Sequence, residues 1–469
     1  MNKTEIQEEE PEQCLSKEEV HELRKKYFSP NVSVSYANSN PLMIMGGSKA
    51  RLFDEMGNSY LDTRNNVAHV GHQNPRVIEA VQTQVATLNT NTRYLHPNAA
   101  VLAQRLADLL PDPLTKVFFV NSGSEANDLA LRLARARTKS NNVICVEHAY
   151  HGHTIKTLEI SPYKFKSREF DLDFNNVLGK SVIKVPCPNT YRGEYRGSDA
   201  ASKYADYVVQ ACSTFKDRGE NVGAFIMEGG MSVGGVILPP PNYLAKSVEA
   251  VRTAGGLFIA DEVQTGLGRL GDDCFWAFQH GGNTDVVPDI VTIGKPFGNG
   301  MPLAAVITTQ EVSDSFHNMG VEYFNTFGGN PVCAAAGLAV LDEIEKYKLP
   351  AHAARVGKYM KTKFRGLDLS ACLGVVIGDI RGCGLFIGIE IVRDNQQPAT
   401  IETSFICTTL KEKFRVLTSI DGPHDNVLVI KPPMVFTEYD ADEFVFGFHQ
   451  SCMLLAENVD LTKISKTPT

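Results

Sequence analysis

The sequence predicts an α/β protein with a mostly parallel sheet covered by helices, joined to a smaller α+β domain. Three observations lead to this fold class. Short, continuously apolar segments recur between about residues 116 and 294, and segments of helical periodicity separate them. Strands that are apolar along their whole length are typical of parallel sheets buried on both faces. After about residue 345 the apolar residues alternate more with polar ones, which indicates the smaller domain.

The elements are expected in the following order. SKEEVHELRKKYF predicts a short helix, and residues 42–62 predict a hairpin whose apolar runs are divided at GGSKA and MGNS. PRVIEAVQTQVATL and NAAVLAQRLADLL predict two helices. The strand KVFFV follows, and then a helix that opens at Ser124 or Glu125. The later predicted elements are the strands NVICVE, VGAFIME, GLFIADE and DIVTIG, the alternating segments IGDIRGCGLFIGIEIV and DNVLVIKPPM, and the helix SFICTTLKEKF.

The length of 469 residues is enough for two or three domains. We expect a polar tail and short helix (1–30), an N-terminal segment that contributes to the small domain (31–75), a large cofactor-binding domain (76–345) and a C-terminal small domain (346–469).

Composition excludes several classes of function. The formal net charge of −8 offers no attraction for nucleic acid or an anionic membrane, and no apolar run approaches the roughly 18 residues of a spanning helix. The ten cysteines form no CxxC pair and no Cys/His cluster, so we expect reduced thiols and no metal site. The acidic start, MNKTEIQEEEPEQC, lacks the features of a signal or transit peptide, which favours the cytosol.

Polar groups follow five of the predicted strands or their loops. They are Asn121 to Ser124, Tyr150, Glu228, Asp261 and Lys295. In open α/β sheets ligands bind beyond the carboxyl ends of the strands, so these groups are expected to form one site.

Each of these groups also has an ordinary structural interpretation. A lysine at a strand end, such as Lys295, is commonly a solvated cap, and Asp261 could cap a turn. Ser122, Gly123 and Ser124 could simply begin a helix. Taken together, they suit pyridoxal phosphate: a helix N-terminus for the phosphate, a carboxylate for the pyridine nitrogen, the flat ring of Tyr150 and a lysine that attacks carbonyl groups.

The motifs NSGSEAN, HAYHG, ADEVQTGLGR, GKPFGNG and NTFGGNP occur in this order, and by them the chain resembles the class III pyridoxal-phosphate aminotransferases of fold type I over roughly residues 35–455. The resemblance implies that Lys295 carries the cofactor and that Gly123 and Ser124 hold its phosphate. It also implies cofactor contacts from Tyr150, Glu228, Asp261 and Gln264. Thr326 would reach the cofactor of a neighbouring subunit, which implies a homodimer with shared sites; the sequence does not show whether dimers pair into tetramers.

Further segments, among them NNVAHVGH, EISPYKF, GDIRGCGLFIGIE and IKPPM, are similar to one branch of that class. It is the ethanolamine-phosphate and 5-phosphohydroxylysine phospho-lyase branch, which is alanine–glyoxylate aminotransferase 2-like. Many class III enzymes carry an arginine before the PP of the C-terminal domain, where it binds the substrate α-carboxylate. LVIKPPM has Lys431 instead, and lysine lacks the planar fork of arginine.

The resemblance therefore implies that Lys295 removes a proton from the substrate and that phosphate leaves the neighbouring carbon. Ethanolamine phosphate is the first expected substrate and 5-phosphohydroxylysine the second. The expected substrate-binding residues are Asn65, Asn66, Arg93 and Lys431, although Arg93 could equally form a structural ion pair. The alternatives are a class III aminotransferase of the alanine–glyoxylate kind and a scaffold that has lost catalysis. Animal relatives of the branch are associated with mitochondria, which leaves the compartment open.

Overall fold

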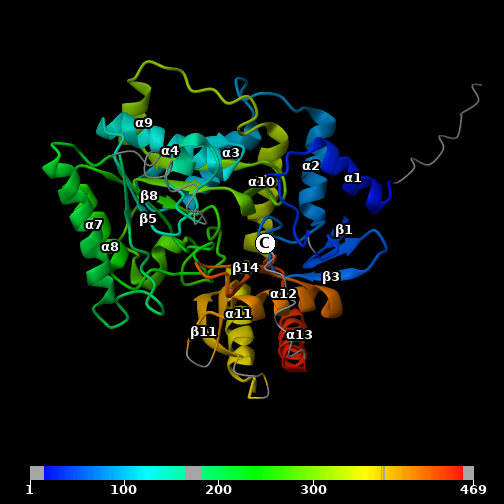
Figure 1. Ribbon diagram of the computed structural model, residues 1–469. Coiled ribbons are helices and arrows are strands. Elements are labelled where there is room, and N and C mark those ends of the chain that lie inside the picture. Colours follow the sequence, from blue (N-terminus) through cyan, green and yellow to red (C-terminus); the bar gives the residue numbers. More distant parts are fainter. Residues whose placement is uncertain are drawn as a thin grey trace, which may run out of the picture.

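The computed structural model describes residues 15–37, 39–163, 181–370, 372, 375–393 and 396–457. The acidic start expected to be a polar tail lies outside these residues, as does the end of the EISPYKF segment. Figure 1 shows a large body built around one sheet, with the C-terminal helices gathered below it and the strands β1 to β3 beside them.

The large sheet has seven strands in the order β4-β10-β9-β8-β7-β5-β6. Strand β10 runs antiparallel to both of its neighbours, and the pairs from β9 to β6 are parallel. The predicted mostly parallel α/β fold is therefore confirmed. The strands are β4 (Leu114–Val120), β5 (Val143–Val146), β6 (Val182–Val185), β7 (Ala224–Glu228), β8 (Leu257–Asp261), β9 (Ile290–Ile293) and β10 (Ala304–Thr309).

Two separate groups of apolar side chains cover the two faces of this sheet. Phe225 and Met227 of β7 belong to the core shared with α7 and α8, whereas Ile226 belongs to the core shared with α4. Successive residues of a strand point to opposite faces, so a strand between two cores is apolar at every position. This arrangement explains the continuous apolar segments in the sequence.

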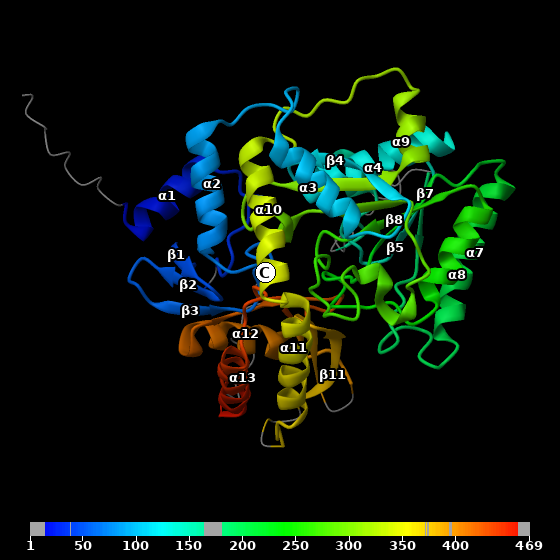
Figure 2. The same cartoon turned by 180° about the vertical axis from the view of Figure 1, so that it is seen from behind.

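Helices pack on both sides of the large sheet (Figures 1 and 2). Helix α4 contacts β9 and β10, α7 and α8 contact each other and the strands β6 and β8, and α10 packs against α2 and α3. These helices are α2 (Pro75–Thr87), α3 (Pro97–Asp108), α4 (Gly123–Thr138), α7 (Ala200–Asp217), α8 (Tyr243–Thr253) and α10 (Pro331–Lys346). The smaller helices are α5 (Ile155–Glu159), η1 (Ala277–Gly282), η2 (Lys295–Gly298) and α9 (Gln310–His317).

The C-terminal part contains a four-stranded antiparallel sheet in the order β11-β12-β15-β14. Its strands are β11 (Val375–Cys383), β12 (Phe386–Arg393), β14 (Ser419–Asp421) and β15 (Val427–Ile430). The remaining helices are α11 (Leu349–Arg365), α12 (Thr400–Phe414) and α13 (Glu438–Glu457). IGDIRGCGLFIGIEIV thus forms two strands that are joined by a turn at Gly384, which has a positive φ of 53°.

The N-terminal strands depart from the expected hairpin. Residues 42–62 form three antiparallel strands, because the chain turns at the last two residues of GGSKA and again at MGNS: β1 (Ile44–Ser48), β2 (Arg51–Asp54) and β3 (Ser59–Asp62). Strand β3 then pairs in parallel with the short β13 (Val416–Leu417), which joins the N-terminal segment to the C-terminal part. The helix expected in SKEEVHELRKKYF is α1 (Lys17–Tyr27), with Ser16 as its N-cap.

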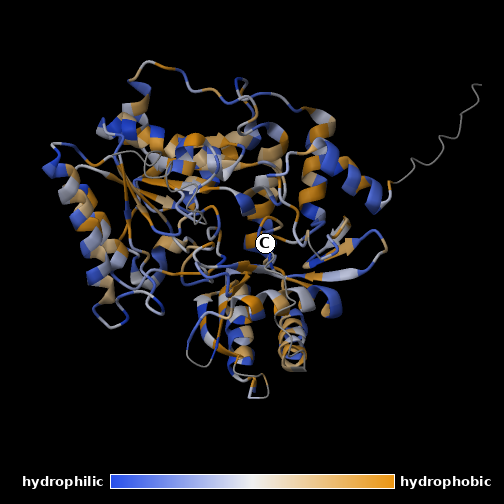
Figure 3. Ribbon diagram, in the orientation of Figure 1, coloured by the Kyte–Doolittle hydropathy of each residue, from blue (hydrophilic) through white to orange (hydrophobic). Residues whose placement is uncertain are grey.

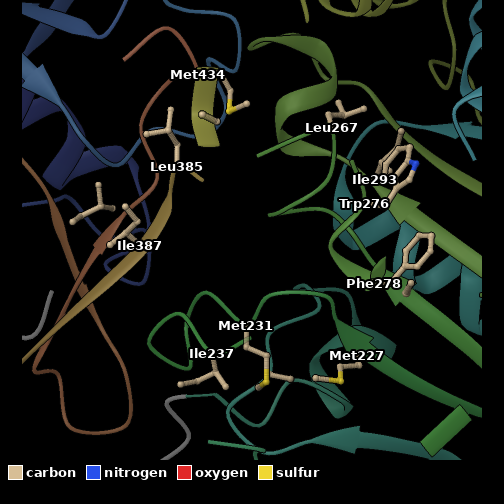
Figure 4. Close-up of a cluster of buried hydrophobic side chains, with 14 of the residues drawn as sticks. Met227, Met231, Ile237, Leu267, Trp276, Phe278, Ile293, Leu385, Ile387 and Met434 are labelled. Atoms are coloured by element: carbon tan, nitrogen blue, oxygen red, sulfur yellow. The ribbon is translucent and has the colours of Figure 1, made fainter. Parts of the chain in front are cut away.

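Buried apolar side chains connect the two parts of the molecule. Figure 4 shows Leu385 and Met434 from the C-terminal part, with Leu267 and Trp276 from the large part, in one buried cluster. In Figure 3 the strands of the large sheet are mainly hydrophobic, whereas the surface helix α1 is mainly hydrophilic. Among the described helices, none combines the length and the apolar character needed to span a bilayer.

Candidate active site

A cavity of about 330 Å³ lies at the carboxyl ends of β4, β5, β8 and β9. It brings together most of the residues that the sequence singled out for the cofactor: Ser122, Gly123, Ser124, Tyr150, Asp261, Gln264 and Lys295. Because the parallel strands end at the same edge of the sheet, loops that are far apart in the sequence meet here.

The N-terminus of α4 forms one wall of the cavity. The helix begins at Gly123, one or two residues before the expected start, because the Ser122 hydroxyl accepts a hydrogen bond from the Glu125 amide (3.2 Å) and caps it. Ser124 lies against Gly152, where a Cβ atom would come within 2.6 Å of the Ser124 Oγ. The close approach leaves the first turn of α4 facing the cavity, where its free N–H groups and helix dipole suit a phosphate.

Asp261 is held in one orientation by three donors. Its Oδ2 accepts hydrogen bonds from Asn127 Nδ2 (2.7 Å) and His151 Nδ1 (2.7 Å), and its Oδ1 accepts one from the Val263 amide (3.1 Å). Thr292 donates in turn to the Asn127 carbonyl oxygen (2.7 Å). Asp261 is 2 % exposed, and these three bonds fix its carboxylate in one orientation in the wall of the cavity.

Asn127 and His151 are functional residues that the sequence analysis did not single out. Both lie inside recognised motifs: Asn127 is the last residue of NSGSEAN, and His151 directly follows Tyr150. Asn127 lies one turn after the start of α4, on its buried face, so it points to the sheet rather than to solvent. The His151 Nε2 atom is buried without a protein partner among the described residues, although its Nδ1 is fixed by Asp261.

Lys295 begins the 3₁₀ turn η2 directly after β9, and its amine lies 5.8 Å from the centre of the Tyr150 ring. Burial lowers the pKa of Lys295, and the charges of Asp261 and Glu228 oppose that effect. A lowered pKa favours the uncharged form of the lysine amine, and only that form can attack a carbonyl group or accept a proton.

Glu228, at the end of β7, accepts hydrogen bonds from two backbone amides. Its Oε1 accepts a hydrogen bond from the Tyr150 amide (2.9 Å), and its Oε2 accepts one from the Ser232 amide (3.4 Å). Burial raises the pKa of Glu228 to about 7. Glu228 therefore holds the loop that carries the Tyr150 ring and does not line the cavity itself.

A second cavity, of about 680 Å³, lies beside the first and contains three of the expected substrate residues: Asn65, Asn66 and Lys431. The Asn66 side chain donates to Gln264 Oε1 (2.5 Å), so this pair of residues stands where the two cavities meet. The Lys431 amine donates to the Ser232 hydroxyl (2.8 Å). Burial lowers the pKa of Lys431 to about 8, and the positive charges of Lys295 and Arg64 act in the same direction.

Arg93 and Thr326 lie outside both cavities of this chain. The Arg93 guanidinium lies 3.4 Å from Glu322 and over the Phe324 ring, with 57 % of its side chain exposed. Thr326 is exposed on the long loop between α9 and α10, which crosses the top of the molecule in Figure 1. Arg64, which the sequence analysis did not single out, lines the second cavity instead.

The donor set of the first cavity fits pyridoxal phosphate. It offers a helix N-terminus for the phosphate, the flat Tyr150 ring, the oriented Asp261 carboxylate and the Lys295 amine. Among the described residues, no group of three or more His, Cys, Asp or Glu side chains is arranged to hold a metal ion. All nine cysteines in this part of the chain are free thiols.

Comparisons with known proteins agree with this geometry. Residues 33–452 match the family model described as aminotransferase class-III. A Drosophila melanogaster protein named alanine–glyoxylate aminotransferase 2-like is 45 % identical over 446 residues, which cover 93 % of this chain and 87 % of the relative. The Caenorhabditis elegans ethanolamine-phosphate phospho-lyase homolog 1 is 39 % identical over 456 residues, 94 % of each chain.

Among solved structures, a phospholyase from Arthrobacter in complex with phosphoethanolamine is similar to the chain. The two are 36 % identical, and the match covers 92 % of this chain and 99 % of the other with a TM-score of 0.83.

Proposed function

Because the chain belongs to the class III aminotransferase family, whose enzymes use pyridoxal 5′-phosphate, we propose that it is a phospho-lyase that eliminates phosphate from an amino phosphate ester. Ethanolamine phosphate is the first proposed substrate, giving acetaldehyde, ammonia and phosphate, and 5-phosphohydroxylysine is the second. The observation that carries the proposal is the pair of cationic side chains, Lys431 and Arg64, that line the cavity next to the cofactor pocket.

The cofactor would be held by the first turn of α4, the Tyr150 ring, Asp261 and Lys295. When bound, pyridoxal phosphate supplies an electron sink that stabilises negative charge on the carbon next to the substrate nitrogen. The Asp261 carboxylate, held by Asn127 and His151, favours a protonated pyridine nitrogen.

The two lysines have separate tasks in this proposal. Lys295 removes the proton from the carbon that bears nitrogen, and its lowered pKa leaves part of the amine free to accept that proton. The C–O bond on the neighbouring carbon then breaks, and phosphate leaves with the electron pair. Lys431 and Arg64 bind the oxygens of the departing phosphate with charged donors. Water then converts the released enamine to aldehyde and ammonia.

The second candidate function is an amino transfer to a keto acid. It is favoured by the 45 % identical relative named alanine–glyoxylate aminotransferase 2-like. The residues of the first cavity would be the same for both reactions. The two candidates differ in the second cavity, where a transaminase needs a carboxylate site and a phospho-lyase needs a site for a phosphate dianion.

Phosphate release separates the two candidates. We expect the purified holoenzyme to release inorganic phosphate and ammonia in equal amounts from ethanolamine phosphate or 5-phosphohydroxylysine, with no keto acid added. Strict dependence on a keto acid, with no phosphate released, would contradict the proposal and support the transaminase. A protein that shows no visible cofactor absorbance after incubation with pyridoxal phosphate would instead be a scaffold.

We also propose that the enzyme is a homodimer with shared sites. Large apolar side chains are exposed at the end of α2, on the α2–α3 connection and on the long loop that carries Thr326. They include Val85, Leu88, Tyr94, Leu95, Met319, Val321 and Phe327. Exposed apolar patches of this kind mark protein–protein contacts, and a second copy that covered them would also enclose Thr326.

A further inference from the structure

Arg269 is a fully buried arginine on the loop that follows β8. Asp261 ends β8, and Gln264 lies early in this loop; both residues line the cofactor cavity. The Arg269 guanidinium does not reach that cavity. Its Nη1 donates to the carbonyl oxygens of Pro432 (2.8 Å) and Leu385 (3.1 Å), and its Nη2 contacts His69 Nδ1 (3.2 Å).

All three of these acceptors are neutral. His69 donates from Nε2 to the Leu267 carbonyl oxygen (3.0 Å), so its Nδ1 is free to accept from Arg269. Burial and the Arg269 charge lower the pKa of His69 to about 3, which keeps the imidazole uncharged. No salt bridge to Arg269 is found among the described residues, and its Nε has no partner there. A buried cation without a carboxylate costs stability, so packing alone does not account for this arginine.

Two of the three acceptors, Pro432 and His69, lie close in sequence to residues that line the second cavity. Pro432 directly follows Lys431, and His69 lies three residues after Asn66. These two segments are also bonded to each other, since the Met434 amide donates to the His69 carbonyl oxygen (2.7 Å) and the Lys431 amide donates to Thr63 (2.8 Å).

Leu385 lies at the turn between β11 and β12 and bonds to Arg269 in both directions. The Leu385 amide donates to the Arg269 carbonyl oxygen (3.0 Å), and the Leu385 carbonyl accepts from the guanidinium. A Cβ atom on the neighbouring Gly384 would overlap the Arg269 carbonyl oxygen, so the two backbones are in close contact. Leu385 also belongs to the buried apolar cluster that contains Met434 and Leu267 (Figure 4).

We propose that Arg269 is a positioning residue that fixes the wall carrying Lys431 and Asn66 relative to the wall carrying Asp261 and Gln264. A guanidinium can reach three acceptors at once because its donors form a planar fork. The inference rests on the proposed role of Lys431 in binding the substrate phosphate. It adds that the geometry of that subsite is set by a residue that does not touch the substrate.

The test measures binding of inorganic phosphate to the holoenzyme by isothermal titration, together with the cofactor absorbance and the thermal midpoint. Arg269→Lys keeps the charge and Arg269→Met keeps much of the volume, but neither can bridge three acceptors. We expect both variants to bind phosphate about tenfold more weakly and to raise the KM for ethanolamine phosphate to a similar extent, with little change in the cofactor absorbance.

Arg381→Lys is the matched control. Arg381 also connects the C-terminal sheet to the large part, because it donates to the carbonyl oxygens of Gly235 (2.8 Å) and Val236 (3.1 Å), but it pairs with Asp379 and Glu390. We expect this variant to lower the thermal midpoint without changing phosphate affinity. If the Arg269 variants are not soluble, His69→Leu removes only the Nη2 contact, and a weakening of about threefold is expected.

Unchanged phosphate affinity in the Arg269 variants, with a lower thermal midpoint, would overturn the positioning role and leave a structural one. For His69→Leu, unchanged affinity would have the same meaning. A wild-type holoenzyme that binds no phosphate and releases none from ethanolamine phosphate would instead overturn the proposed function, and with it the role of Lys431 on which this inference depends.

Discussion

Lys295 and Lys431 both line cavities, and burial lowers the pKa of each, yet the consequences differ. Lys295 must give up its proton in order to act as a base, so a lower pKa helps it. Lys431 must keep its proton in order to bind a phosphate, so a lower pKa limits the pH range in which it works. The same physical effect therefore activates one lysine and restricts the other.

The pKa of about 8 for Lys431 predicts a pH dependence of phosphate binding. As the pH rises through this value the free enzyme loses the charge on Lys431, so the affinity for inorganic phosphate should fall. Lys431→Arg keeps its charge at all these pH values and should remove that fall. Lys431→Met should bind phosphate roughly ten- to a hundredfold more weakly throughout. Titration calorimetry from neutral to alkaline pH measures the phosphate affinity of the wild type and of the two variants. A wild-type affinity that is constant over this range would contradict the role of Lys431.

Helix α4 connects local sequence to the cofactor pocket. Its N-cap, Ser122, is exposed and lines the cavity, so its hydroxyl can both cap the helix and meet a cofactor phosphate. One turn later Asn127 faces the sheet and holds Asp261. The N-terminus of this helix would thus hold the cofactor phosphate, and a residue one turn later fixes the carboxylate that would face the pyridine nitrogen.

Replacing Ser122 by alanine separates capping from cofactor binding. We expect Ser122→Ala to destabilise the apoenzyme by about 1 kcal/mol and to weaken cofactor binding about tenfold. Thr309→Ala is the control, because Thr309 caps α9 by accepting from the Val312 amide (3.2 Å) and, at the end of β10, does not line the cavity. Thr309→Ala should lower the free energy of unfolding by a similar amount and leave the cofactor affinity unchanged. Denaturant titration and cofactor titration give the two values, and full cofactor affinity in Ser122→Ala would contradict the predicted phosphate contact.

At the scale of the whole molecule, an exposed apolar surface lies next to Thr326. We propose that a second copy of the chain covers this surface. Phe327, with 65 % of its surface exposed, lies beside Thr326 on that loop. We expect Phe327→Asp to shift the protein from dimer to monomer in light scattering, since an aspartate would be costly to bury in an apolar contact. It should also reduce cofactor affinity if Thr326 acts across the contact.

Met56→Asp provides the comparison, because Met56 is 79 % exposed at the turn between β2 and β3, away from this surface. This variant should leave the molar mass measured by light scattering at the value of the wild-type dimer. A wild-type protein that is monomeric at micromolar concentration would rule out the proposed dimer, and equal effects of the two variants would show that the surface around Phe327 is not the contact.

The N-terminal and C-terminal segments illustrate what could not be read from the sequence. The parallel pairing of β3 with β13 connects residues more than 350 positions apart, and no local pattern marks it. Likewise the sequence contains both Arg64 and Arg93, and no local pattern shows which of them lines a cavity of this chain. Only the packing of 63–72 against 431–434 places Arg64 in the cavity and leaves Arg93 beside Glu322.

The sequence by itself determined the mostly parallel sheet and the residues at the carboxyl ends of its strands. Both follow from local rules: a strand buried on two faces must be apolar throughout, and parallel strands end at one edge. The tertiary structure alone decided that Glu228 holds the Tyr150 loop, that Asn127 and His151 orient Asp261, and that Arg269 joins the two walls of the site. These roles depend on which distant segments meet, and a buried polar group finds its partner only after the chain has packed around it.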